Sequence, residues 1–344
     1  MANNRIFYAV QAVKMKPCTS DASSTSYGSE VILKGIQSVG ITTNFNLEQV
    51  YQLGQLELYD NVEEVPDIEV TLNKVLDGTR LVYNTATDGS NSSGNNLGLT
   101  QIADRRCDVA LGIYNDTDVG TSGAATYYVV CTGMYVSSVS YNLVTDGNFT
   151  EDVTLVGNHK KWSLTTGSGI KNFNSGVTDN GSQTTKVARR SAFNKDLSIL
   201  PTGDNNLPST VGELHINSIT LSCNLGRESI NELGRRSPYY RYVNFPVEVT
   251  SEFEITATRG DQVDADDFGT LTGCTAASAS NLTAKQIKIF VCSSNTNSVD
   301  YVFDLGTRNK LTSVNYTGGE TGGGNSTITY SYQTFNDFKV SGVA

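Results

Sequence analysis

The chain has 344 residues, of which 38% are apolar, and a formal net charge of −10. That length suits two ordinary domains or one large one, and the acidic balance excludes a protein that grips nucleic acid through clustered Lys and Arg. Six dispersed cysteines without a C-x-x-C pair, and only two histidines, disfavour a zinc site and a disulfide scaffold. We expect buried thiols in a reducing cytoplasm, no signal peptide and no membrane span.

Alternating apolar residues predict β-strands along most of the chain, with one face of each strand buried and the other in water. Long stretches with helical period are missing, so we expect at most one short helix in each half of the chain. Such strands predict an all-β fold of the β-sandwich or half-barrel type. In chain order, the stripes are Val39–Phe45, Ile68–Leu72, Cys107–Ile113, Val139–Leu143, Val153–Leu155, Ile219–Leu225 and Val247–Ile255.

The sequence contains an internal repeat. Residues 36–66 align with residues 216–246 without a gap, at an offset of 180, and eight of the 31 pairs are identical. A one-residue slip then aligns IEVT (68–71) with VEVT (247–250), and VSSVSYNL (136–143) resembles LTSVNYTG (311–318). The repeat predicts two tandem β domains, which we call unit one (1–170) and unit two (189–344), joined by a polar linker (171–188).

Two 19-residue segments interrupt the alternation, Asn46–Glu64 and Gly226–Asn244, and we call them arm one and arm two. Loops of this length are uncommon unless they have a function, and these are rich in Leu and Tyr. We interpret them as arms that pack against a neighbouring subunit, with folding back onto their own core as the alternative. The candidate interface residues are Tyr51, Leu53, Gly54, Leu56, Leu58, Tyr59, Ile230, Leu233, Gly234, Arg235, Arg236, Tyr239, Tyr240 and Tyr242.

Residue patterns for chemistry are weak throughout the chain. His159 lies in a polar run, His215 begins a predicted strand, and neither has a nucleophile elbow nearby. The acidic loop Asp261–Asp267 departs from the spacing of a calcium-binding loop, so we expect a solvated loop there. We therefore predict no catalytic, metal-binding or cofactor-binding residues, although carboxylates from distant strands could still form a glycosidase pair. The polar segment Thr85–Asn96 is expected to be an exposed loop tip.

The runs SVGITTNFNLEQVYQLGQLELYDNVEEVPDIEVTLNKVLDGT (38–79) and RESINELGRRSPYYRYVNFPVEVTSEFEI (227–255) resemble the tail tube, or major tail, proteins of long-tailed bacteriophages. The shared pattern is a strand, a long arm that contains Leu-Gly, and a second strand with Glu-Val-Thr. The resemblance implies a virion tail protein, made in the host cytoplasm, that self-assembles into stacked rings. Strands would surround a channel through which DNA leaves, and long loops would lock ring to ring.

With two units in one chain, three copies would complete a ring with pseudo-sixfold symmetry; a hexamer of two-layer subunits is the alternative. The resemblance implies further partners in the tail terminator, the baseplate and a sheath, and DNA that passes without specific binding. The rival functions are a terminator or baseplate subunit of the same fold, and a carbohydrate-binding or adhesin module. The single Trp162 argues mildly against the latter. Candidates to face the channel are Glu69, Thr71, Glu248 and Thr250.

Overall fold

A computed structural model describes residue 6 and residues 11–18, 30–87, 97–114, 125–163, 170, 186–210, 212–264, 271–272, 275–276, 283–292, 298–319, 321 and 324–342. Within these residues the chain is nearly all β, which confirms the predicted fold class. Most of the predicted linker (171–185) lies outside the described residues, and the boundaries of the two units stay a prediction.

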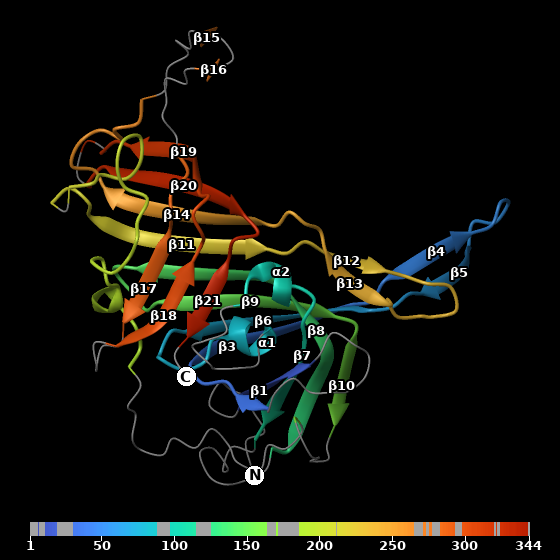
Figure 1. The fold of residues 1–344 in the computed structure, drawn as a ribbon. Coiled ribbons are helices and arrows are strands. Elements are labelled where there is room, and N and C mark those ends of the chain that lie inside the picture. Colours follow the sequence, from blue (N-terminus) through green and yellow to red (C-terminus); the bar gives the residue numbers. More distant parts are fainter. Residues whose placement is uncertain are drawn as a thin grey trace.

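Eight antiparallel strands form one continuous sheet that runs through both units (Figure 1), and we call it the long sheet. The second half of β8 pairs with β11 and thereby joins unit one to unit two, while β3 and β19 lie at the two free ends. In spatial order the strands are β3 (Ile36–Asn44), β6 (Asp67–Val75), β9 (Thr150–Gly157), β8 (Tyr127–Val144), β11 (Ile216–Asn224), β14 (Glu248–Thr256), β20 (Thr327–Phe335) and β19 (Lys310–Thr317).

A second layer covers one face of the long sheet in each unit. In unit one it consists of β2 (Val31–Ile32), β1 (Gln11–Cys18), β7 (Arg106–Ile113), the first half of β8 and β10 (His159–Ser163). In unit two it consists of β17 (Lys288–Cys292), β18 (Val299–Asp304) and β21 (Lys339–Gly342). The remaining strands are two hairpins in the arms, β4 (Leu47–Tyr51) with β5 (Leu58–Glu63) and β12 (Arg227–Ile230) with β13 (Tyr240–Val243), and a short pair, β15 (Leu271–Thr272) with β16 (Thr275–Ala276).

The two halves of the long sheet have the same topology and the same irregularities. The order β3-β6-β9-β8 in unit one corresponds to β11-β14-β20-β19 in unit two. The β3 ladder shifts register between Ile36 and Ser38, and the β11 ladder shifts between Ile216 and Ser218, at the predicted offset of 180. A second pair of bulges follows Val136 and Leu311, at an offset of 175. Bulges in the same places give both halves the same local bend.

The ladders correct one detail of the sequence alignment. Val70 lies opposite Ile41, whereas Ser251 lies opposite Leu221, so the strands after the arms correspond at an offset of 181 rather than 179. The match of IEVT with VEVT is therefore wrong by two residues. Because side chains in a strand alternate with a period of two, a shift of two residues leaves every residue on its predicted face.

The described residues of unit one include two short α-helices, α1 (Val82–Thr87) and α2 (Leu99–Ile102), so the expectation of at most one was wrong. A 3₁₀ turn, Arg190–Ala192, lies at the start of unit two. Thr85, Ala86 and Thr87 are buried in α1 instead of lying in an exposed loop tip. The hydroxyls of Thr85 and Thr87 donate to the carbonyls of Leu81 and Tyr83, at 2.8 and 2.7 Å, which satisfies them inside the core.

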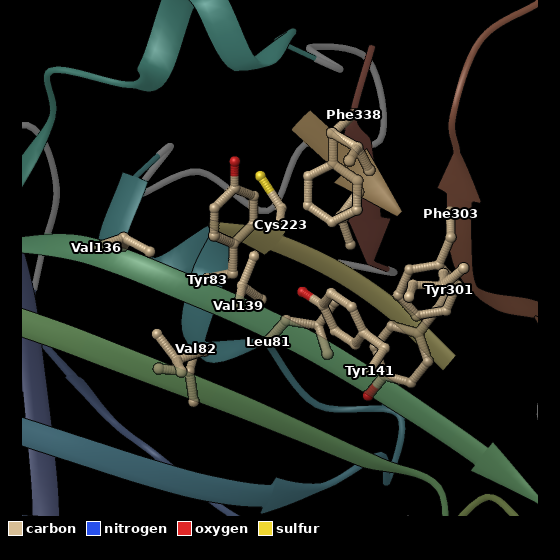
Figure 2. Packing of buried hydrophobic residues seen from close by; sticks show 14 of the residues in the cluster. Leu81, Val82, Tyr83, Val136, Val139, Tyr141, Cys223, Tyr301, Phe303 and Phe338 are labelled. Carbon is tan, nitrogen blue, oxygen red and sulfur yellow. The ribbon is translucent and has the colours of Figure 1, made fainter. Parts of the chain in front are cut away.

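One hydrophobic core connects the two units. Tyr141 of β8 packs against Phe303 of β18 with ring centroids 4.6 Å apart, and Tyr83 of α1 packs against Phe338 at 5.7 Å (Figure 2). The hydroxyl of Tyr301 donates to the carbonyl of Thr79 at 2.7 Å, which also links unit two to unit one. The two units are therefore halves of one packed body, because most of the buried apolar residues belong to a single cluster.

Two buried ionisable side chains hold the connection between β6 and α1. Lys74 donates to the carboxylate of Asp77 at 2.8 Å, to the hydroxyl of Thr79 and to the carbonyl of Lys34. Glu151 of β9 accepts from the backbone N–H groups of Val82 and Tyr83, at 2.7 and 3.0 Å, and from the hydroxyl of Tyr141 at 2.9 Å. Glu151 thus fixes the first turn of α1 to the long sheet.

Candidate assembly interface

The junction between β8 and β11 shows how one half of the long sheet accepts another. Seven residue pairs connect the strands, from Ser218 opposite Val144 to Asn224 opposite Ser138. The side chains that face the core from both strands are buried at this junction. The backbone N–H of Leu225 extends the contact by donating to the carbonyl of Ser137 at 2.8 Å.

The two free ends of the long sheet are the counterparts of these joined strands. β3 corresponds to β11, β19 corresponds to the second half of β8, and within the described residues each pairs on one side only. Tyr141 is fully buried at the junction, whereas its counterpart Tyr316 on β19 is 49% exposed. Leu225 is 1% exposed, whereas its counterpart Phe45 is 73% exposed. Unpaired strand edges with exposed apolar side chains are sites for pairing with another chain.

The arms extend from the same end of the long sheet (Figure 1). Their hairpins have matching registers, since Leu47 pairs with Glu63 as Arg227 pairs with Val243. Each arm turns at the Leu-Gly pair found in the sequence, and Gly54 and Gly234 have φ angles of +89° and +86°. Only residues without a side chain adopt that conformation at low cost, which explains why both turns carry Gly.

Arm two packs in part against unit one. The rings of Tyr240 and Tyr135 are 6.1 Å apart, and the guanidinium of Arg227 lies 5.1 Å from the centre of the Tyr135 ring. Arg241 forms an ion pair with Asp67 at 2.8 Å, and the exposed Arg236 lies 3.8 Å from Glu63 at the base of arm one. Tyr240 and Tyr242 are half-buried, and the other candidate interface side chains in both arms are exposed.

Aspartates in place of Leu53 and Leu56 should leave the free energy of unfolding within about 0.5 kcal/mol of the wild type. Both leucines are fully exposed at the tip of arm one, so the folded chain loses no packing when they are replaced. Urea unfolding of Leu53→Asp/Leu56→Asp measures the effect. Leu225→Asp is the control, and it should be strongly destabilising because Leu225 is buried. A large loss in the tip variant would instead show that arm one folds onto its own core.

The outward face of the long sheet, which we call the polar face, carries Ser, Thr, Asn and carboxylates. Its acidic residues are Asp67, Glu69, Asp152, Glu248, Glu252 and Glu254. The predicted channel residues Glu69, Thr71 and Glu248 are exposed on this face, and Thr250 is half-buried beside Ser222, with their hydroxyls 2.6 Å apart. Among the strands that form it, Lys310 is the one basic residue that lies outside the core.

The residues considered for chemistry are dispersed in the structure. The ring of His159 lies 2.9 Å from the Thr132 hydroxyl on the neighbouring strand, and His215 uses its backbone carbonyl to accept from Thr256. The first four residues of the acidic loop, Asp261 to Asp264, are described, whereas its last three residues (265–267) and Cys274 lie outside the described residues. Burial raises the pKa of the Cys223 thiol to about 12, so the reactive thiolate is scarce at neutral pH.

No described helix is both long enough and apolar enough to cross a membrane.

The sequence matches no protein-family model and no curated protein. Among solved structures, it is similar to the tube-terminating cap of an anti-feeding prophage, with a TM-score of 0.33 and 11% identity, over 48% of this chain and 95% of that one. It is also similar to a chain of the sheath–tube complex, in the extended state, of an extracellular contractile injection system. There the TM-score is 0.31 and the identity 11%, over 47% of this chain and 94% of that one.

Proposed function

We propose that the chain is a structural subunit of a phage-type tail tube, which self-assembles head to tail into rings that stack around a central channel. The observation that carries the proposal is the relation between the joined strands and the free ones. β8 and β11 join two halves inside one chain, whereas their counterparts β19 and β3, at opposite ends of the same sheet, each have one edge without a partner strand among the described residues. A second copy supplies the missing partner for each, and a head-to-tail contact that repeats by rotation closes a ring.

The in-chain junction also supplies a register for the proposed pairing between copies. Transferring its register through the offsets of 180 and 175 places Ile41 opposite Tyr316, as Leu221 lies opposite Tyr141. Thr43 then lies opposite Val314, as Cys223 lies opposite Val139. Phe45 follows at the position of Leu225, where it enters the shared core. The proposed contact buries the apolar side chains that the single chain leaves exposed on β3 and β19.

Three copies give the more suitable channel. Eight strands from each of three copies make a barrel of twenty-four strands. With a strand spacing of about 4.8 Å and a tilt of about 40°, its backbone diameter is about 48 Å. After the inward-pointing side chains are subtracted, that width still admits a DNA double helix. Six copies would double the diameter, so we propose a ring of three with pseudo-sixfold symmetry.

The polar face lines the channel in this arrangement, because the second layer and the core cover the other face of the long sheet. Its carboxylates repel DNA phosphates, so DNA slides past without being held. The chain then belongs in the virion tail, with a terminator, a baseplate and a sheath as further partners. The arms, which leave one end of the sheet, are available for contacts along the tube.

Negative-stain electron microscopy of the purified chain at high concentration tests the function. The expected result is hollow tubes with an axial repeat, whose end-on averages show three copies in each ring. Single rings that never stack would assign the chain to a terminator of the tube. A monomer at every concentration, confirmed by light scattering, would contradict self-assembly and favour the adhesin or carbohydrate-binding alternative.

A further inference from the structure

The two arms have the same backbone register and opposite charge. Arm one carries five acidic residues and no basic residue, whereas arm two carries four arginines and two glutamates. Their hairpin ladders nevertheless agree pair by pair, so each residue of one arm has a defined counterpart 180 positions away in the other. The difference in charge therefore lies on matching surfaces of two similar hairpins.

Arm two occupies a seat on unit one that is formed at the bulged segment of β8. Tyr240 and Arg227 both contact the ring of Tyr135, and the Arg227 side chain donates to the carbonyl of Val136 at 2.7 Å. Val136 begins the bulge of β8, and its counterpart Leu311 begins the bulge of β19. The seat thus has a counterpart on unit two, beside the free edge, with Lys310 in the position of Tyr135.

The residues that change between the two seats are complementary. Asp60 of arm one stands where arm two has Tyr240, since Asp60 pairs with Val50 as Tyr240 pairs with Ile230. Asp60 and Lys310 are both exposed in the single chain. An aromatic pair, Tyr240 on Tyr135, is therefore replaced at the second seat by a carboxylate and an ammonium group.

We propose that arm one of each copy seats on unit two of the next copy, with Asp60 facing Lys310. This inference rests on the head-to-tail ring proposed above and adds the contact that distinguishes its two kinds of junction. Arm one placed on the in-chain seat would put the Asp60 carboxylate in place of the Tyr240 ring, and the aromatic contact with Tyr135 would be lost. Arm two placed on the second seat would bring Arg227 to Lys310, where like charges repel. The charges thus direct each arm to its own seat.

Charge reversal in the full chain tests the seat. Asp60→Lys and Lys310→Asp should each raise the protein concentration at half-assembly about five- to ten-fold in low salt, because attraction between exposed charges becomes repulsion. In the double variant Asp60→Lys/Lys310→Asp, the concentration at half-assembly should return to within about two-fold of the wild-type value. In 1 M NaCl the differences should largely disappear, because screening shortens the electrostatic range to about 3 Å. Sedimentation velocity measures assembly, and thermal melting checks that every variant is folded.

Glu57→Lys is the matched control, since Glu57 lies in the turn of the same arm and the change in charge is identical. The concentration at half-assembly of Glu57→Lys should stay within about two-fold of the wild-type value. The proposed seat would be overturned if Glu57→Lys weakened assembly as much as Asp60→Lys does. It would also be overturned if the double variant assembled as weakly as either single variant. If all variants form rings as the wild type does, the seat is wrong and the ring proposal survives. A wild-type chain that never assembles overturns both.

Mixing the two single variants in equal amounts adds a test of the copy number. A junction between different variants is matched in charge, whereas a junction between identical variants is not. A ring of six can alternate the variants and recover fully. A ring of three must contain at least one pair of identical neighbours, so its recovery should stay incomplete. Complete recovery would therefore contradict the count of three.

Discussion

Ile41→Lys is expected to prevent ring formation at the concentrations where the wild type assembles, while leaving the single chain folded. Ile41 lies on the free edge strand β3, where its side chain is only half-buried, so the lysine ammonium can still reach water in the monomer. In the proposed ring the same position lies opposite Tyr316 and is closed off from water. Burying an unpaired ammonium there costs several kcal/mol at every junction. We expect the concentration at half-assembly to rise more than about 100-fold, and the monomer to lose about 1–2 kcal/mol of stability.

Leu221→Lys is the matched control at the corresponding position of unit two. Leu221 is fully buried at the junction inside the chain, so the same substitution should destabilise the fold by more than about 4 kcal/mol. Sedimentation velocity and urea unfolding measure assembly and stability separately. Rings formed by Ile41→Lys at wild-type concentration would show that β3 is not an assembly edge.

Glu151→Ala should cost about 3–5 kcal/mol of the free energy of unfolding. Glu151 is fully buried and accepts three hydrogen bonds, two from the backbone of α1 and one from Tyr141. Its removal leaves three buried donors without an acceptor and opens a cavity beside them. Urea unfolding, at concentrations where the chain is monomeric, measures the loss.

Asp152→Ala is the control for Glu151, because it removes the neighbouring carboxylate on the exposed face of the same strand. Asp152 accepts one hydrogen bond from Asn73 at 2.6 Å, so its loss should cost at most about 1 kcal/mol. Equal costs for the two substitutions would mean that Glu151 does not hold α1 on the long sheet.

The pKa of Glu151 gives this prediction a pH dependence. Burial raises its pKa above the ordinary value of 4.5, against the opposing effect of its hydrogen bonds. The folded chain therefore keeps this proton to a higher pH than the unfolded chain does. Relative to Glu151→Gln, which does not titrate, the wild type should lose stability as the pH rises from 4.5 through the raised pKa. If the wild type instead gained stability relative to Glu151→Gln over that pH range, the pKa of Glu151 would be lowered rather than raised by folding.

The sequence predicted the repeated parts of the fold well, because they are encoded locally. Strands show themselves by alternation, and the arms by their length, their Leu-Gly turns and the gap-free offset of 180. The exposure of the arms was also predicted. Their docking on another copy stays a prediction, and the structure adds that Tyr240 of arm two packs within the chain.

The errors have physical causes that the sequence conceals. The misalignment of IEVT with VEVT kept every residue on its face, so alternation could not reveal it. Helix α1 is six residues long and contains two threonines, which are weak helix formers, and its position depends on the distant Glu151. A signal for Glu151 existed, since it shares the core side of β9 with Val153 and Leu155.

The junction of β8 with β11 could not be predicted from the sequence. Strand alternation tells which face is buried and says nothing about which distant strand lies alongside. Two separate domains and one continuous sheet therefore fit the same pattern. The significance of Phe45 and Tyr316 becomes visible only through their buried counterparts Leu225 and Tyr141.

The polar face, with its six carboxylates in each chain, gives the proposed tube an ion atmosphere of its own. Closing a ring would gather these groups around one axis, and mobile cations would have to follow them to limit their mutual repulsion. DNA that enters such a channel brings its own cation cloud and meets another of the same sign. Contact between the channel wall and the DNA phosphates then releases no counterions. Counterion release is the free-energy contribution that makes most DNA-binding surfaces bind DNA, and it is missing here. DNA would therefore slide along the channel wall without binding to it. The cations inside the channel would depend on those in the surrounding solution, divalent cations above all.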